Sequence, residues 1–296
     1  MTDTSMPASP KNERYRRFIE QIDNLPSLPS IVSRLIQVVN SPDTSADDAA
    51  KLIQKDPALT TKMLRLANSA FYGIPRSISS VSSAVVILGF NTIRSLVLSA
   101  SVMKMFSGSK KPAFDKDRFW KHSIVCALAA KTIVRQFINI RMMDPESAFC
   151  AGILHDIGKL IFSEFAGEDY QEVCKFAQTN NVSLLDAERQ IFGIGHSDIG
   201  RILADKWALP LDLEYALVYH HEPKNSDNLL DLVTTVHVAD ILTHQVGLGL
   251  WDGEVTPPEW DQAARVLRLE SADRERILTL LADSIEKSGE FIDIIK

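Results

Sequence analysis

The chain of 296 residues has few cysteines, glycines and prolines, and each shortage excludes a class of protein. Its 3 cysteines are far apart and form no C-x-x-C pair, which excludes a disulfide framework and a cysteine-based zinc site. With 13 glycines, 13 prolines and average shares of hydrophobic and charged residues, the chain is neither a fibre nor a disordered protein. We therefore expect Cys126, Cys150 and Cys174 to be buried in helix cores.

The sequence also lacks an excess of positive charge and a long uncharged apolar run. Asp and Glu number 38 against 32 Lys and Arg, so there is no electrostatic basis for sequence-independent binding of nucleic acid. The most apolar stretch, residues 84–106, contains Asn91, Arg94 and Lys104 and falls short of the ~18 uncharged residues of a membrane span. The N-terminus has no apolar signal-peptide core. These absences predict a soluble, cytoplasmic protein whose partners are neither nucleic acid nor membrane.

Apolar residues recur with the period of a helix along almost the whole chain, whereas strand-like alternation is scarce. One apolar stripe runs from Leu52 to Leu66 and another from Ile199 to Trp207. The sequence therefore predicts an all-α fold. Breaks at 107–112 and 249–258 divide it into a mobile tail (1–13), an N-terminal helical half (14–108), a second helical half (113–248) and C-terminal amphipathic helices (257–296).

Two aspartates of the second half lie in apolar helical surroundings, where charge is costly. Asp156 follows His155 inside residues 148–162, and Asp240 lies within residues 233–242. An unpaired carboxylate there would cost several kcal/mol, so each needs a positive partner. Asp156 could pair with Lys159 three residues on, and Asp240 with Arg94 or Arg201.

Histidines offer the other solution, a shared metal. The candidates are His122, His155, His196 and the pair His220-His221, whose imidazoles together with carboxylates suit divalent Zn, Mn, Fe, Co or Ni. Such a set could hold one ion or two, and a two-ion site suits phosphoester hydrolysis. His237 and His244 flank Asp240 at i−3 and i+4, either as support for the ligands or as exposed residues.

The ordered set of motifs resembles the HDOD family, an HD-related output domain of bacterial signal transduction. The resemblance covers roughly residues 20–245. It implies an N-terminal helical subdomain packed on an HD-type helical bundle, so that 14–108 and 113–248 are the two halves of one HDOD domain. The matching segments are 25–29 (LPSLP), 56–60 (DPALT), 64–72 (LRLANSAFY), 78–81 (ISSV), 84–89 (AVVILG), 155–159 (HDIGK), 195–196 (GH), 207–210 (WALP) and 219–221 (YHH).

The site itself is similar to that of the related HD-GYP cyclic-di-GMP phosphodiesterases. Lys159 matches the lysine that faces the substrate phosphate there. Two departures stand out: residues 160–165 contain no Gly-Tyr-Pro motif, and Arg118 occupies the position where some HD-GYP enzymes use a glutamate for a third metal. The residues that match the two-metal ligands are His122, His155, Asp156, His196, His220, His221 and Asp240.

The resemblance implies two functions. The first is a regulatory signal-transduction protein with an HD-type metal site, which binds other signalling proteins or a small phosphorylated ligand. The alternative is a metal-dependent phosphohydrolase or phosphodiesterase acting on a nucleotide or cyclic dinucleotide, with Asp156 bridging the ions and Lys159 facing the phosphate. In the regulatory case the metal site is structural or vestigial. The expected cofactor is two divalent ions, and Fe, Mn, Ni and Zn are equally compatible with the ligands. The sequence leaves the oligomeric state open.

Overall fold

The structure, a computed structural model, describes residues 10–22, 25, 27–39, 44–69, 72–106, 112–137, 143–252, 254–255 and 260–295. These residues form sixteen α-helices and one 3-10 helix, with no strand among them, which confirms the all-α prediction. The helices are α1 (Pro10–Ile22), α2 (Ser30–Val39), α3 (Ala46–Ile53), α4 (Pro57–Ala67), α5 (Val81–Leu88), α6 (Phe90–Met105), α7 (Lys116–Gln136), α8 (Pro145–Leu154), α9 (Ile157–Phe165), α10 (Gly167–Asn180), α11 (Leu184–Ile191), α12 (His196–Trp207), α13 (Leu211–Tyr219), η1 (Pro223–Asn225), α14 (Leu230–Gln245), α15 (Trp260–Leu267) and α16 (Ser271–Ile295).

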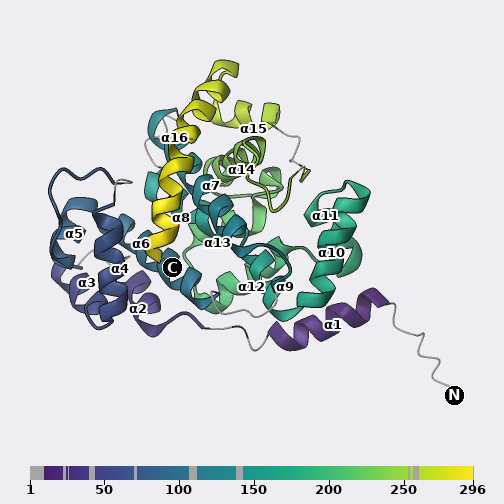
Figure 1. Cartoon of the computed structure of the whole chain (residues 1–296), viewed down its shortest axis with the longest axis horizontal. Coiled ribbons are helices and arrows are strands. Elements are labelled where there is room, and N and C mark those ends of the chain that lie inside the picture. The colour runs from purple at the N-terminus through teal and green to yellow at the C-terminus, as the bar shows by residue number, and fades with distance from the viewer. Residues whose placement is uncertain are drawn as a thin grey trace.

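Helices α2 to α6 form the N-terminal half of the molecule, and local sequence signals set their ends (Figure 1). Ser45 caps α3 in a capping box with Asp48, and Asp56 caps α4, whose first residue is Pro57. Gly89, with φ 86°, lets the chain turn by 120° between α5 and α6. The apolar faces of these short helices then pack on the long, buried α6.

Helix α7 is the centre of the second half and contacts α8, α14 and α16 (Figure 1). Its interior face is almost entirely buried from Phe119 to Val134. Glycine at position 152 of α8 allows the closest approach, because a Cβ there would lie 2.6 Å from the Cα of Ala127. Helices α9 to α13 surround α7, α8, α14 and α16. They carry or flank those polar residues of the candidate site that do not lie on α7 or α14.

The two terminal helices pack on the rest of the molecule, α1 on α9 and α11 and α16 on both halves. The C-terminal pair of helices is present as expected, and α16 runs from α7 to α4 and α6, so that it joins the second half to the N-terminal half (Figure 1). Helix α1 begins at Pro10, inside the stretch 1–13 expected to be a tail, and Phe18 stacks on Phe162 with ring centroids 4.6 Å apart. The expected junction at 107–112 and the break at 249–258 fall partly outside the described residues.

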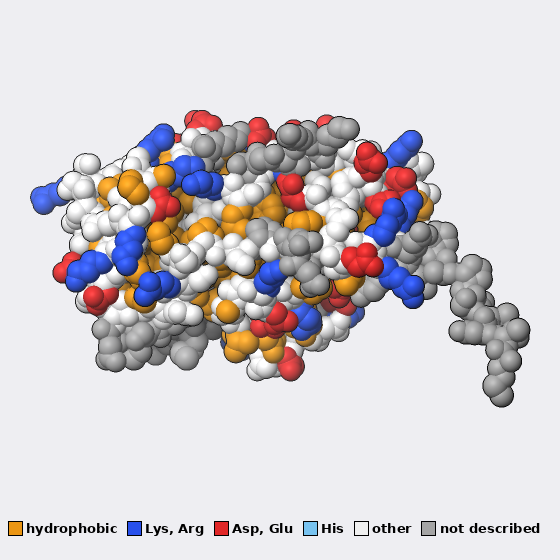
Figure 2. All heavy atoms as spheres, turned by 90° about the horizontal axis from the view of Figure 1, so that it is seen from below, with side chains coloured by type: hydrophobic (Ala, Val, Ile, Leu, Met, Phe, Trp, Pro, Cys, Tyr) orange, Lys and Arg blue, Asp and Glu red, His pale blue; other side chains and the backbone are white. Residues whose placement is uncertain are grey.

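The cysteines and the apolar helices bear on two predictions made from the sequence. All 3 cysteines are free and buried, as predicted. No single described helix is long and apolar enough to span a membrane; α5 and α6 meet the length and composition criteria only as a pair, bent by 120°. On the face in Figure 2, Lys and Arg side chains stand among Asp and Glu side chains, and apolar side chains gather near the centre.

Candidate metal centre

The predicted ligands come from helix ends and from two long buried helices. His155 and Asp156 lie at the break between α8 and α9, His196 is the first residue of α12, and His220 and His221 directly follow α13. His122 and Asp240 lie inside α7 and α14. His221 is partly buried and the other six are at most 2% exposed, although every one is polar. The structure brings all seven into one centre.

The seven residues form two groups that meet at Asp156. One group is His122, His155 and Asp240, and the other is Asp156, His196, His220 and His221. Oδ2 of Asp156 lies 3.3 Å from Nε2 of His155 and 3.6 Å from Nε2 of His122. Its Oδ1 lies 3.3 Å from Nε2 of His196 and 3.5 Å from Nε2 of His220. Asp156 therefore has one oxygen for each group, the arrangement of a bridging carboxylate.

Hydrogen bonds on the far side of the rings orient four of the histidines. Nδ1 of His122, His155 and His220 lies 2.8–2.9 Å from the backbone oxygens of Leu248, Gly152 and Ala216, respectively. Nδ1 of His196 lies 2.7 Å from a carboxylate oxygen of Glu188. Because these oxygens only accept, each Nδ1 donates, and each Nε2 is left facing the centre as a ligand atom.

The inward nitrogen atoms of the histidines lie so close together that a cation between them is more favourable than direct contact. Nε2 of His196 lies 2.8 Å from Nε2 of His221, and the corresponding atoms of His122 and His155 are 3.4 Å apart. Two nitrogen lone pairs at such distances need a cation or a proton between them. Among the described residues, Oδ1 of Asp156, Oδ1 of Asp240 and Nε2 of His220 are buried without a hydrogen-bond partner. The arrangement therefore suits a divalent metal.

The charge states are consistent with metal ligation. Burial lowers the pKa of His220 to about 4, so its ring is neutral at pH 7. Burial raises the pKa of Asp156, but His155 and Lys159 outweigh burial and hold that pKa well below its usual range. Burial lowers the pKa of His155, but Asp156, Cys126 and Asp240 together outweigh burial and raise that pKa well above the ordinary value. Without a bound cation His155 thus keeps a proton, which a metal would displace.

The two aspartates differ in whether they form the ion pairs that the sequence allowed. Lys159, 3% exposed, does pair with Asp156, with Nζ 2.6 Å from Oδ2, so this aspartate has both a lysine and histidines as neighbours. Asp240 pairs with neither arginine: Arg94 contacts Asp212, and Arg201 donates to the hydroxyl of Tyr219. Its neighbours are instead His122, His155 and His244.

Residues beyond the predicted set complete the surroundings. His237 and His244 were left open by the sequence; His237 is buried and its Nδ1 donates to the backbone oxygen of His220, and His244 is partly buried with its Nε2 3.3 Å from Asp240. Glu188 was missed, although it occupies an inward position of an amphipathic helix, as Leu184 and Ala187 do. The signal available in the sequence was a carboxylate at a position where the helix period predicts an apolar residue.

Arg118 supports the site from outside. Its guanidinium donates to the backbone oxygens of Gly249 and Gly247 and pairs with Asp252 at 2.7 Å. These contacts hold the turn that presents the backbone oxygen of Leu248 to His122. The position that differs from some HD-GYP enzymes thus orients a ligand through the turn.

Replacing Glu188 with Gln tests whether Glu188 holds His196 in place. The carboxylate accepts hydrogen bonds from the backbone N and Nδ1 of His196 and from the hydroxyl of Tyr170, and it is fully buried. Glu188→Gln removes the charge and one acceptor, so we expect about 10- to 100-fold weaker metal binding, measured by chelator competition. The exposed Glu286→Gln on α16 is the control. Unchanged affinity in Glu188→Gln would contradict this role.

A cleft of about 510 Å³ leads from the surface to the centre. His196, His221, His244 and Lys159 line its inner part. Arg189 and Glu222, paired at 2.8 Å, also line it, as do residues 181–186, which include the start of α11. A small molecule in this cleft can therefore contact His196 and His221, two of the candidate ligands.

The comparison with protein families decides the identity of the fold. The HDOD domain model matches residues 25–223, about two thirds of the chain. The chain belongs to the HDOD family. This confirms the resemblance derived from its motifs, and residues 25–223 include six of the seven candidate ligands, with Asp240 beyond the match.

Two solved structures share this fold, and one curated relative matches most of the chain in sequence. An HDOD domain protein of unknown function from Geobacter sulfurreducens is 28% identical, with a TM-score of 0.78 over 95% of this chain and 97% of that one. A candidate phosphohydrolase from Shewanella amazonensis SB2B has the same fold, with 23% identity and a TM-score of 0.74 over 95% and 98% of the two chains. An uncharacterized protein of Treponema pallidum (strain Nichols) is 25% identical over 87% of this chain. The chain spans 49% of the length of that relative.

Proposed function

We propose that this HDOD protein binds a small phosphorylated ligand at a two-metal centre and hydrolyses a phosphoester bond in it, as part of signal transduction. The observation that carries the proposal is the bridging geometry of Asp156, whose two oxygens face two separate groups of inward ligand atoms. A site for about two ions at the end of an open cleft is an arrangement that supports phosphoester hydrolysis.

The residues have separate tasks in this proposal. His122, His155 and Asp240 would hold one ion and His196, His220 and His221 the other, with Asp156 shared between them. The metals, of the Fe, Mn, Ni or Zn type, supply Lewis acidity and activate water at neutral pH. Lys159 keeps its positive charge beside Asp156 and lines the cleft, where it offsets negative charge on the phosphoryl oxygens.

A second candidate function is binding without turnover, in which the metal-loaded domain acts as a sensor for other signalling proteins. The short contact between Lys159 and Asp156 favours it, because Nζ at 2.6 Å already engages the oxygen that faces His122 and His155. If Lys159 stays there, it competes with the first ion for this carboxylate. The phosphorylated ligand would then be held in the cleft without hydrolysis.

Metal analysis and a hydrolysis panel distinguish the two functions. Protein purified without a His-tag or chelators should contain about two transition-metal ions per chain by mass spectrometry. After anaerobic loading with Mn, Fe, Ni or Zn, it should hydrolyse at least one cyclic dinucleotide, cyclic mononucleotide or nucleotide, and His155→Ala should abolish this activity. Full loading without turnover, together with ligand binding, would replace the hydrolase by the sensor. Failure to bind any metal would reject both.

A further inference from the structure

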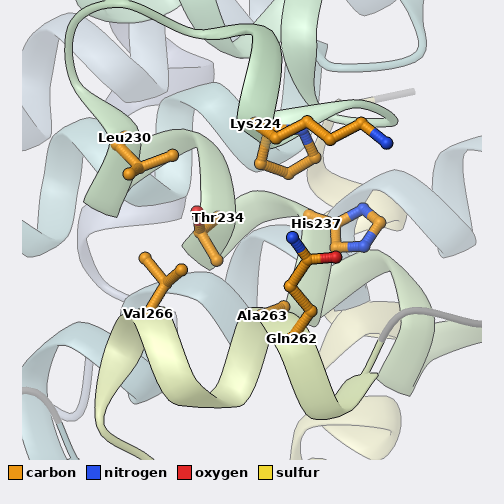
Figure 3. A pocket seen from close by; sticks show the side chains of 8 residues that line it. Lys224, Leu230, Thr234, His237, Gln262, Ala263 and Val266 are labelled. Atoms are coloured by element: carbon orange, nitrogen blue, oxygen red, sulfur yellow. The ribbon is translucent and has the colours of Figure 1, made fainter.

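A second cavity lies outside the cleft, between α14, α15 and η1 (Figure 3). Its volume is about 290 Å³, and it shares no lining residue with the cleft. Figure 3 shows Thr234 between Leu230 and Val266, with His237 and Lys224 across the cavity. The metal centre described above makes no use of this space.

One buried polar group in the cavity wall lacks a partner. Thr234 is 1% exposed, and its hydroxyl oxygen has no hydrogen bond. The other two threonines of α14 behave differently, because Thr235 and Thr243 each donate to the backbone oxygen four residues earlier, at 2.7 Å. A buried hydroxyl without a partner is unfavourable, and a ligand that bonds to it would remove the cost.

The rest of the lining defines the chemistry of an occupant. Leu230, Ala263 and Val266 give an apolar wall, whereas Lys224 is exposed and is the one formally charged side chain among the described residues of the lining. An apolar body with one negative group complements this arrangement. The volume corresponds to roughly ten water-sized groups, which sets the size of the occupant at about ten non-hydrogen atoms.

The cavity is one hydrogen bond away from the metal ligands. His237 lines it, and Nδ1 of His237 donates to the backbone oxygen of His220 at 2.7 Å. That oxygen belongs to the peptide bond between His220 and His221, both of which point at the centre. A molecule that fixes the ring of His237 would therefore also fix the peptide that carries two ligands.

We propose that this cavity is an effector site for a small carboxylate with an apolar body, whose binding pre-organises His220 and His221 through His237. Thr234 bonds to the polar group of the effector, and Lys224 complements its charge. The binding step is independent of the function proposed above, whereas the effect on the ligands rests on the metal centre. By linkage, an effector that favours the metal-ready arrangement tightens metal binding, and metal tightens effector binding equally.

The binding step is tested on the metal-free full chain by fluorine NMR. The probes are 4-fluorophenylacetate, its amide and 4-fluorophenethylamine, which share one apolar body and differ in charge. We expect the carboxylate to bind with a Kd of about 0.1–1 mM, and the amide and amine at least tenfold more weakly. Val266→Trp should fill the cavity and abolish binding, and Lys224→Gln should remove the preference for the carboxylate. The exposed Lys55→Gln is the charge control.

Thr234→Val tests whether ligand binding can be weakened without a loss of stability. Valine has the shape of threonine without the unpartnered hydroxyl, so the variant should keep its thermal stability while it binds the carboxylate several-fold more weakly. Absence of carboxylate binding at 10 mM, equal binding of all three probes, or unchanged binding by Val266→Trp would each overturn the proposal.

The effect on the metal centre is tested with Mn²⁺ and a competing chelator. At saturating 4-fluorophenylacetate we expect about fivefold tighter Mn²⁺ binding. The same measurement on Val266→Trp corrects for chelation by the probe itself. His237→Phe keeps an aromatic wall but cannot bond to His220, so it should bind the probe without the fivefold gain. Unchanged Mn²⁺ affinity in the native chain would overturn the link to the metal centre, whereas a chain that binds no Mn²⁺ would instead contradict the proposed function.

Discussion

Gly158→Ala is expected to lower the free energy of unfolding by about 3–4 kcal/mol, because the two helices that meet at the metal centre have no room for a methyl group. A Cβ at position 158 would lie 2.1 Å from the backbone oxygen of His196 and 2.8 Å from its carbonyl carbon. Backbone cannot rotate out of the way, so α12 must move away from α9. His196 would move with it, away from Asp156, and metal affinity should fall in the molecules that still fold.

Gly289→Ala is the matched control. Gly289 is exposed within α16, and a Cβ there meets nothing within 4 Å. The same substitution should therefore stabilise the chain, by up to ~1 kcal/mol, through helix propensity alone. Thermal unfolding of the two metal-free variants gives the comparison, with a midpoint about 10 °C lower for Gly158→Ala. Equal midpoints would show that α9 and α12 do not approach as closely as described.

Asp156→Asn should abolish hydrolysis, with a loss of at least ~10³-fold, and reduce metal binding at both groups. Among the residues that the structure describes, the charge that it removes is the only one shared by His155 on one side and His196 on the other. The substitution also leaves the buried Lys159 without its ion-pair partner; burial lowers the pKa of Lys159, but Asp156, Glu254 and Asp240 together outweigh burial and keep it charged. Breaking a buried ion pair in this way costs about 3–5 kcal/mol of stability in the metal-free protein.

A double variant separates the loss of ligation from the loss of stability. Asp156→Asn with Lys159→Met removes both charges, so stability should recover while metal binding stays lost. The exposed Asp205→Asn on α12 should change neither property. Metal content by mass spectrometry and the midpoint of chemical unfolding are the two measurements. Wild-type metal content in Asp156→Asn would exclude a bridging role for this carboxylate.

Much of the fold could be predicted because it depends on local signals. The period of the apolar residues, Ser45 and Asp56 as helix caps, and Gly89 as a turn act within a few residues of one another. The helix over 10–22 was missed in part because its first residues are polar. Its stability comes from contacts such as Phe18 against Phe162, which are remote in sequence.

The candidate ligands could also be derived from the sequence, because a charged or ligating residue in an apolar helix needs a partner wherever it lies. That argument selected Asp156 and Asp240 and then the histidines, and the family resemblance ordered them. It could not decide between metal and ion pair, since Asp156 has histidines and Lys159 within reach at the same time. Nor could it choose the partner of Asp240, which depends on how α7 and α14 pack.

The sequence by itself thus determined the all-α class, the family and the seven inward residues. Only the tertiary structure decided how these residues are held. Three of the histidines donate to backbone oxygens. Because every residue has a backbone oxygen, the sequence does not show which of them accepts a hydrogen bond. The approach of α9 to α12 at Gly158, the burial of Glu188 behind His196 and the cavity beside His237 likewise arise from the packing of distant helices, which local patterns do not encode.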